Sequence, residues 1–278
     1  MDELAILAKS QDLNFVAKFS EDMHNLLALL GKTEVETVAP GTAHKIYKVT
    51  GTLDEGDVGE KELIPDSAIS VGTPTLIEIN YKKYRNLTSI EEIGRKGYDL
   101  AVGETNDFIR RQIRKRVRKT IFTAIKKGTG TAQGNTFQAT VADAAKSIVK
   151  LYEDEDITPV FFASPDDLYD YLGTHEVGLA QNFGLSYLAN FLGIGDIIVD
   201  TNIDKGQVFA TAKENLKVLA ADIKSIPGME LTTDESGIIG VHNGAKYENA
   251  ALETVAYTGL GVQPIYLNRI VKASLVTG

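Results

Sequence analysis

The chain has 278 residues, of which 43% are hydrophobic and 24% charged, and its formal net charge is -9. These proportions are typical of a globular protein with a large core. The sequence contains no cysteine, which excludes disulfide bonds and thiolate metal ligands. No apolar run approaches the roughly 18 residues of a membrane span, and the N-terminus lacks the pattern of an export signal.

The first element is a predicted helix over residues 13–30. Its apolar side chains recur at helical spacing, and Gly31 ends the pattern. Two interpretations are open. The helix packs in the core of its own subunit, or it forms an arm that lies on a neighbouring subunit.

Residues 43–52 and 73–84 are rich in β-forming side chains and predict two strands of one long hairpin. The segment between them carries six acidic residues against one lysine, Lys61. It is either a solvated loop or, because long loops without structure are uncommon in compact domains, a functional one. The acidic residues are Asp54, Glu55, Asp57, Glu60, Glu62 and Asp66.

Residues 98–127 predict one long helix, preceded by a short helix over 86–95 that Thr88 or Ser89 caps. An apolar residue recurs every four positions from Ile109 to Ile125. Between these lie seven cations, which repel one another and therefore call for counter-charge from elsewhere. They are Arg110, Arg111, Arg114, Lys115, Arg116, Arg118 and Lys119.

Glycines at Gly128, Gly130 and Gly134 predict a flexible hinge and a boundary between subdomains. Beyond it the pattern is α/β. Helices are predicted over 141–153 and 164–172, and strands over 158–163, 195–200 and 207–212. The last segment, 250–278, predicts strands that return to the sheet beside the long helix.

The sequence offers no catalytic signature. Its histidines (His24, His44, His175 and His242) are isolated from one another and lack metal-ligand spacing. No serine has the setting of a hydrolase nucleophile, and the glycines after the long helix lack the lysine of a nucleotide loop. We therefore expect neither an enzyme nor a cofactor or metal.

The order of these elements resembles that of the major capsid proteins of tailed bacteriophages, which have the Hong Kong 97-type fold. The sequence is similar to those of long-tailed phages of Gram-positive bacteria, in particular at VAPGTAHKIYK, INYKKYRNLTSIEEIGRKGYDLAVGETND and VAYTGLGVQPIYLNRI. This resemblance implies an α+β fold with an N-terminal arm, an extended hairpin called the E-loop, a peripheral domain with a long spine helix, and an α/β axial domain.

The resemblance also implies domain bounds and partners. The arm covers 1–40, the E-loop 41–86, the peripheral domain 87–134, the axial domain 135–249 and the C-terminal return 250–278. Subunits of this family build pentamers and hexamers, and these form an icosahedral shell around double-stranded DNA. We expect a separate scaffolding protein, a portal, assembly in the host cytoplasm and a place in the virion capsid. Lys61 and either Asn249 or Asn268 have the chemistry of an isopeptide cross-link.

The charge pattern yields a hypothesis about the interface between subunits. The acidic hairpin of one subunit is expected to lie across the basic helix of its neighbour, through Asp54, Glu55, Asp57, Glu60 and Glu62 on one side and Arg111, Arg114, Lys115, Arg118 and Lys119 on the other. Arg110 and Arg116 are candidates to face DNA phosphates. An encapsulin-type compartment and a nucleic-acid-binding regulator are the alternatives.

Overall fold

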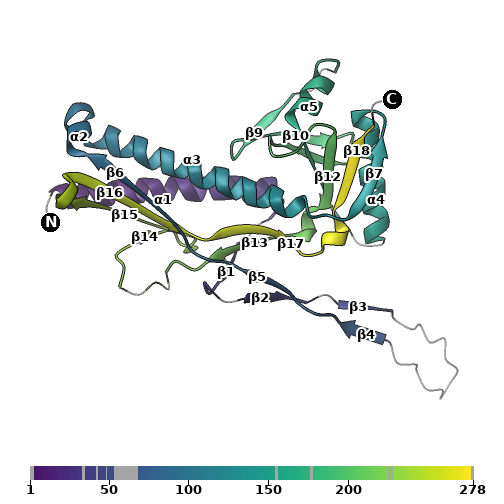
Figure 1. Ribbon diagram of the computed structural model, residues 1–278, viewed down its shortest axis with the longest axis horizontal. Helices are drawn as coiled ribbons and strands as arrows, with labels where there is room; N and C mark the ends of the chain where they lie inside the picture. The colour runs from purple at the N-terminus through teal and green to yellow at the C-terminus, as the bar shows by residue number, and fades with distance from the viewer. Residues whose placement is uncertain are drawn as a thin grey trace.

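The computed structural model describes residues 3–32, 35–41, 43–47, 49–52, 68–153, 156–175, 178–224, 226 and 228–276. Two lobes lie end to end, and a hairpin projects from the region where they meet (Figure 1). The first lobe holds the three N-terminal helices and two sheets. The second holds a seven-stranded sheet and two helices.

The helices of the first lobe are α1 (Glu3–Leu29), α2 (Ile90–Lys96) and α3 (Tyr98–Ile125). Beside them a four-stranded antiparallel sheet has the order β14 (Thr232–Thr233), β15 (Ile239–Lys246), β16 (Ala251–Thr258) and β6 (Lys82–Ser89). The short 3-10 helix η2 (Tyr247–Asn249) joins β15 to β16. A second sheet has the order β1 (Glu36–Val38), β13 (Leu216–Ala221) and β17 (Leu260–Pro264), with β1 parallel to β13.

Helix α1 packs within its own subunit, as the first of the two interpretations predicted. It begins ten residues before the expected start, and its apolar side chains Phe15, Phe19 and Leu26 enter the same core as those of α3. The two helices run side by side in the same direction (Figure 1). Polar contacts at a constant sequence offset follow from this parallel register, for example Gln11 Nε2 to Asp99 Oδ1 at 3.0 Å.

A buried carboxylate also fixes α1 to the four-stranded sheet. Asp12 is only 3% exposed; it accepts hydrogen bonds from Asn243 Nδ2 at 2.7 Å and from Thr232 Oγ1 at 3.3 Å. Burial raises the pKa of Asp12, because desolvation penalises the charged carboxylate, although these hydrogen bonds oppose the shift. The helix is therefore held by directional polar contacts as well as by apolar packing.

The sheet of the second lobe has the order β7 (Gly130–Gly134), β18 (Val271–Leu275), β12 (Gln207–Ala212), β8 (Pro159–Ala163), β11 (Gly195–Val199), β10 (Leu185–Phe191) and β9 (Ala180–Asn182). Helix α4 (Phe137–Tyr152) covers one face, where Ala144 and Ile148 pack on Phe161. Helix α5 (Pro165–Leu172) follows β8, capped by Ser164. The C-terminal end of α3 covers the other face, where Phe122 meets Phe162 edge to face at 5.7 Å.

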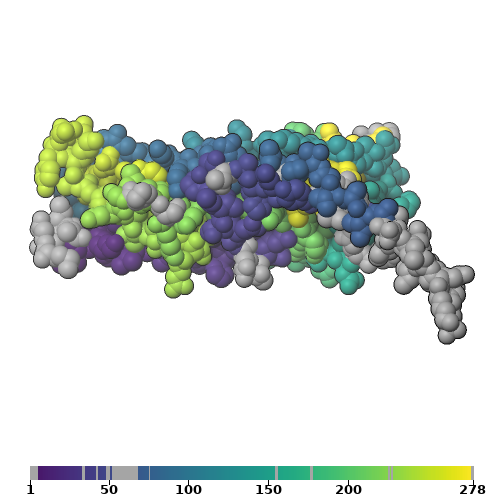
Figure 2. Space-filling model, turned by 90° about the horizontal axis from the view of Figure 1, so that it is seen from below, coloured from purple at the N-terminus to yellow at the C-terminus, as the bar shows by residue number. Residues whose placement is uncertain are grey.

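The predicted hairpin is present in two parts. Strand β2 (Ala43–Ile46) pairs with β5 (Thr75–Glu78), and further out β3 (Val49–Thr52) pairs with β4 (Ala68–Val71). Seen from below, the indigo residues of the hairpin cover the middle of the elongated body (Figure 2). The acidic segment between β3 and β4 lies outside the described residues.

The structure differs from the sequence-based expectations in three local places. Residues 86–89 belong to strand β6, and the helix begins only at Ile90. Ser89, one of the two predicted caps, is confirmed: its Oγ accepts from Glu92 N at 3.2 Å. Within the glycine-rich segment, Gly130–Gly134 pairs with β18 as strand β7, which the sequence did not predict. Of the C-terminal strands, β16 and β17 lie in the first lobe as expected, but β18 joins the sheet of the second.

Candidate subunit interface

Helix α3 presents three distinct flanks, because residues four apart lie on the same side of a helix. The apolar flank predicted from the sequence is buried from Ile109 to Ile125. The two remaining flanks carry the cations. One faces the rest of the same chain, and the other faces solvent.

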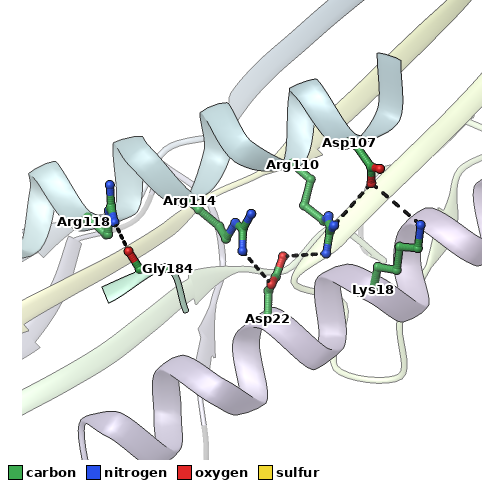
Figure 3. Close-up of polar contacts among 7 residues, drawn as sticks. All are labelled: Lys18, Asp22, Asp107, Arg110, Arg114, Arg118 and Gly184. Atoms are coloured by element: carbon green, nitrogen blue, oxygen red, sulfur yellow. Dashed lines mark hydrogen bonds and ion pairs between the residues drawn. The ribbon is translucent and has the colours of Figure 1, made fainter. Parts of the chain in front are cut away.

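The inner flank is made by Arg110 and Arg114, which meet α1. Both guanidinium groups bind the carboxylate of Asp22, each at 3.2 Å, and Arg110 also reaches Asp107 at 3.2 Å (Figure 3). The side chain of Asp22 is 8% exposed. Counter-charge for these two cations therefore comes from the same chain.

Arg118 continues the inner flank toward the second lobe. Its Nη1 donates to the carbonyl oxygen of Gly184, at the turn between β9 and β10, at 2.5 Å (Figure 3). Its Nε lies 3.7 Å from the buried carboxylate of Asp200, which follows β11. Arg118 thus ties the C-terminal half of α3 to the sheet of the second lobe.

The outer flank consists of Arg111, Lys115 and Lys119, which we call the cationic strip. All three side chains are exposed. None of them forms an ion pair with any residue that the structure describes. Three like charges along one line of a helix repel one another, and the described part of the chain supplies no counter-charge for the cationic strip.

A groove lies beside the strip, between α3 and strands β6 and β17. Its rim carries Lys82, Arg116, Lys119 and Lys127, and we call it the basic groove. Its volume is about 330 Å³, and its wall includes the apolar side chains of Val117 and Leu260. The Arg116 guanidinium lies over the ring of Tyr84, 5.3 Å from its centroid. The groove combines an apolar wall with a positive rim.

The structure separates the predicted cations into two groups. Arg110, Arg114 and Arg118 bind their own chain, whereas Arg111, Lys115, Arg116 and Lys119 are exposed. The five acidic residues predicted to meet them, Asp54, Glu55, Asp57, Glu60 and Glu62, lie outside the described residues. Lys61 of the possible cross-link lies there as well. The meeting of the two charged surfaces stays a prediction.

The predicted hinge glycines have a role in close packing. A Cβ atom on Gly134 would lie 2.3 Å from the backbone nitrogen of Thr140, and one on Gly128 would lie 2.5 Å from the side chain of Ile270. Only glycine fits at such distances. That these residues act as a hinge stays a prediction.

Sequence reasoning missed the partners of the inner flank. Asp22 lies on α1 and Asp200 at the end of β11, so both reach α3 only in the folded chain. It also missed that Lys82 and Lys127 join Arg116 at one groove. The one sequence signal was that Asp22 lies at the edge of the apolar stripe of the predicted N-terminal helix, although this does not identify its partner.

No group of three or more metal-ligating side chains occurs among the residues that the structure describes. In the same part of the chain, no helix has the length and apolar content to cross a membrane. The features that stand out on this surface are therefore its charges and its grooves.

The sequence matches no protein-family model and no curated protein. Solved structures do match the fold. The chain is similar to a virus-like particle protein of Pyrococcus furiosus, with 14% identity and a TM-score of 0.55 over 98% of this chain and 100% of that one. It is also similar to a cyanophage capsid protein, with 9% identity and a TM-score of 0.53 over 88% and 86% of the two chains.

The chain has the Hong Kong 97-type capsid fold. The same fold relates it to an encapsulin of Synechococcus elongatus, with 8% identity and a TM-score of 0.51 over 87% of this chain and 85% of that one. The expected α+β fold class is thus confirmed. The structural similarity establishes the fold, but at identities this low it does not establish the function.

Proposed function

We propose that this chain is the major capsid protein of a tailed bacteriophage. Copies assemble through pentamers and hexamers into an icosahedral shell that encloses double-stranded DNA. The observation that carries the proposal is that one fold matches nearly the whole length of this chain to shell-forming proteins, including a virus-like particle and a phage capsid. The partners are further copies of the chain, a scaffolding protein and a portal, and the location is the virion capsid, assembled in the host cytoplasm.

The elements divide among the roles of a shell subunit. The hairpin from β2 to β5, within the expected range 41–86, serves as the E-loop, since β6 lies in the four-stranded sheet. The first lobe serves as the peripheral domain; of its expected ranges, 87–134 and 250–278, strands β7 and β18 lie in the second lobe. The second lobe serves as the axial domain, whose tip meets other copies around a capsomer axis. Of the expected range 135–249 it holds the part up to the end of β12, because β13 and β15 lie in the first lobe. Residues 1–40, expected as an arm, contribute α1 to the body of the subunit.

The cationic strip and the acidic segment supply charge complementarity between copies. Strands β3 and β4, which lead into the acidic segment, project away from the body (Figure 1), and Ile69 and Val71 on β4 are exposed on them. A hairpin directed outward suits contact with a neighbour. Each exposed ion pair contributes only about 0.2 to 1 kcal/mol, but repetition around a closed shell adds these terms and fixes register.

Packaged DNA is the competing partner for the exposed cations. Phosphate neutralisation needs no base-specific contact, and Arg116 with the basic groove supplies positive charge on a flank of α3 different from Arg111. Arg110 is bound to Asp22 and Asp107 in the same chain, so Arg116 is the stronger candidate of the two predicted earlier.

A second candidate function is an encapsulin-type compartment, which the similarity to the Synechococcus protein supports. The contents of purified particles distinguish the two. A phage capsid is expected to hold double-stranded DNA when made in infected cells, whereas a compartment holds a protein cargo.

Sedimentation of the purified full-length protein tests the proposal. We expect pentamers, hexamers or uniform closed particles at high protein concentration, visible by negative-stain electron microscopy. A protein that stays a monodisperse monomer under these conditions, with and without a scaffolding protein from the same genome, would contradict it.

A further inference from the structure

The two lobes are joined at three places within the described part of the chain, and all three lie together. Residues 126–129 lead from α3 to β7. The 3-10 helix η1 (Lys213–Asn215) leads from β12 to β13, and residues 265–270, which include η3 (Leu267–Arg269), lead from β17 to β18. The junction therefore consists of three adjacent connecting segments, each of which crosses from one lobe to the other.

Asn215 binds the second crossing to the third. Its side chain is 2% exposed and uses both of its polar ends. Oδ1 accepts from Tyr266 N at 2.8 Å, while Nδ2 donates to Tyr266 O at 2.9 Å and to Thr211 Oγ1 at 3.0 Å. The backbone oxygen of Asn215 also accepts from Ile265 N at 2.8 Å. We call this set of bonds the Asn215 clasp.

The third crossing is bound in turn to the first. Thr129 N donates to Leu267 O at 3.3 Å, and Gly130 N donates to Ile270 O at 2.9 Å. Thr211 Oγ1, which accepts from Asn215, donates to Arg269 O at 3.0 Å. The segment Tyr266–Ile270 thus lies at the centre of the junction and is bonded on both sides.

Apolar packing between the lobes does not by itself define their angle. The core around Phe122 and Phe162 spans both lobes, but apolar burial is non-directional and tolerates a change of angle that keeps the same area buried. A buried amide with directional partners tolerates much less, since rotation would leave its donors and acceptors unsatisfied. Arg118 also makes polar contacts between the lobes, but its side chain is partly exposed, whereas the Asn215 clasp is buried and lies at the junction itself. The clasp therefore supplies a directional constraint that apolar packing lacks.

We propose that the Asn215 clasp fixes the angle between the two lobes and, through it, the curvature with which subunits join in a shell. The role in shell curvature rests on the proposed function. The role in the angle between the lobes does not, and it is tested on dissociated subunits.

The first measurement is amide hydrogen exchange on dissociated full-length subunits carrying Asn215→Leu, with Thr211→Val as a milder second variant. Tyr266 N loses its acceptor in Asn215→Leu, so its exchange should rise by about tenfold or more. If the clasp holds the lobes, exchange should also rise at Thr129 and Gly130, whose own bonds the substitutions leave untouched. Solution scattering should show a broader distribution of subunit shapes.

Asn243→Leu is the matched control. Asn243 is also a buried asparagine, 3% exposed, but its partners Asp12 and Thr254 lie within the first lobe. Exchange at Thr129 and Gly130 should stay at the wild-type rate in this variant. Equal rates at those amides in Asn215→Leu, Thr211→Val and the wild type, with unchanged scattering, would overturn the inference.

The second measurement is the diameter distribution of assembled particles. Wild type and Asn243→Leu should give one diameter, whereas Asn215→Leu and Thr211→Val should give several diameters or open sheets. Uniform particles of wild-type diameter from both junction variants would overturn the role in curvature. Failure of the wild type itself to form particles would contradict the proposed function instead. The hydrogen-exchange result would still decide whether the Asn215 clasp fixes the angle between the lobes.

Discussion

Asp22 binds two arginines of α3, and Arg114 has no other carboxylate partner among the described residues. Removal of one partner from such a contact leaves uncompensated charge, which is costly where water cannot reach it. Asp22→Ala should lower the free energy of unfolding by about 1 to 3 kcal/mol, measured by urea denaturation. This loss of stability is smaller than the loss expected for a fully buried ion pair, because the side chains of Arg110 and Arg114 are 19% and 25% exposed.

Lys18→Ala is the control for that prediction. Lys18 lies on the same helix and pairs with Asp107 at 3.8 Å, but both side chains are more than 40% exposed. Exposed pairs contribute little, so the change should be below about 0.5 kcal/mol. Equal effects of the two substitutions would mean that Asp22 does not hold α1 against α3.

Asp12 makes the stability of the fold depend on pH. Because burial raises its pKa, the protonated form is favoured in the folded state. Its contribution is therefore fully present below the unfolded pKa and is lost as the pH rises through the folded pKa. As the pH rises above the ordinary pKa of an aspartate, about 3.9, the wild type should lose stability relative to Asp12→Asn, measured by urea unfolding at a series of pH values.

Asp196 provides a control of opposite sign. Burial acts against its ionised form, but hydrogen bonds from Lys213 and from the backbone of Asn190 outweigh it and lower the pKa of Asp196. Its contribution is present above the unfolded pKa and is lost as the pH falls. Relative to Asp196→Asn, the wild type should therefore lose stability on acidification. The same sign of pH dependence for both residues would contradict this account.

At the scale of elements, strand β7 and helix α4 approach each other so closely that Gly134 is required between them. Gly134→Ala should destabilise the protein by at least about 2 kcal/mol, since the backbone of Thr140 cannot move aside cheaply. Gly103→Ala is the matched substitution, because Gly103 lies within α3 and nothing is within 4 Å of the added atom. It should stabilise the protein by about 0.5 to 1 kcal/mol. Thermal unfolding of the two variants measures both changes in stability.

The elements that the sequence predicted well are those with a strong local pattern. Helix α3 has an apolar residue every fourth position and was expected with nearly its observed bounds, Tyr98–Ile125. Strand β7 was missed because glycines favour loops locally, and only pairing with β18 and packing on α4 makes a strand there. Long-range pairing overrides local propensity at such a site.

The candidate interface was predictable only in part for a similar reason. The cations of α3 were visible in the sequence, but their division into an inner and an outer flank depends on α1. Asp22 lies 88 residues from Arg110, and nothing local in the sequence links the two. Of the predicted cations, Arg111, Lys115, Arg116 and Lys119 are exposed, and their place in a subunit interface stays a prediction.

At the scale of the whole molecule, the cationic strip is expected to decide whether subunits associate. The double substitution Arg111→Glu and Lys115→Glu should abolish capsomers before any DNA is present, because the acidic segment of a neighbour would then be repelled. Size-exclusion chromatography with light scattering measures the loss. Further substitution of Asp57→Lys and Glu60→Lys in the same chain should restore capsomers.

The matched control reverses two lysines at the same spacing on another exposed helix face. Lys146→Glu and Lys150→Glu on α4 change the net charge equally and should leave capsomers intact. Normal empty shells from Arg111→Glu and Lys115→Glu would assign the strip to DNA or to solvent and remove it from the subunit interface.

The central claim is that the fold of this chain serves to join many copies into a closed shell through oppositely charged surfaces. A cryo-electron microscopy reconstruction of the assembled full-length protein tests it most directly. The account predicts a closed icosahedral particle in which residues 54–62 of one copy lie against Arg111, Lys115 and Lys119 of the next. A particle in which that strip faces only solvent, or a protein that yields no particle at all, would contradict it.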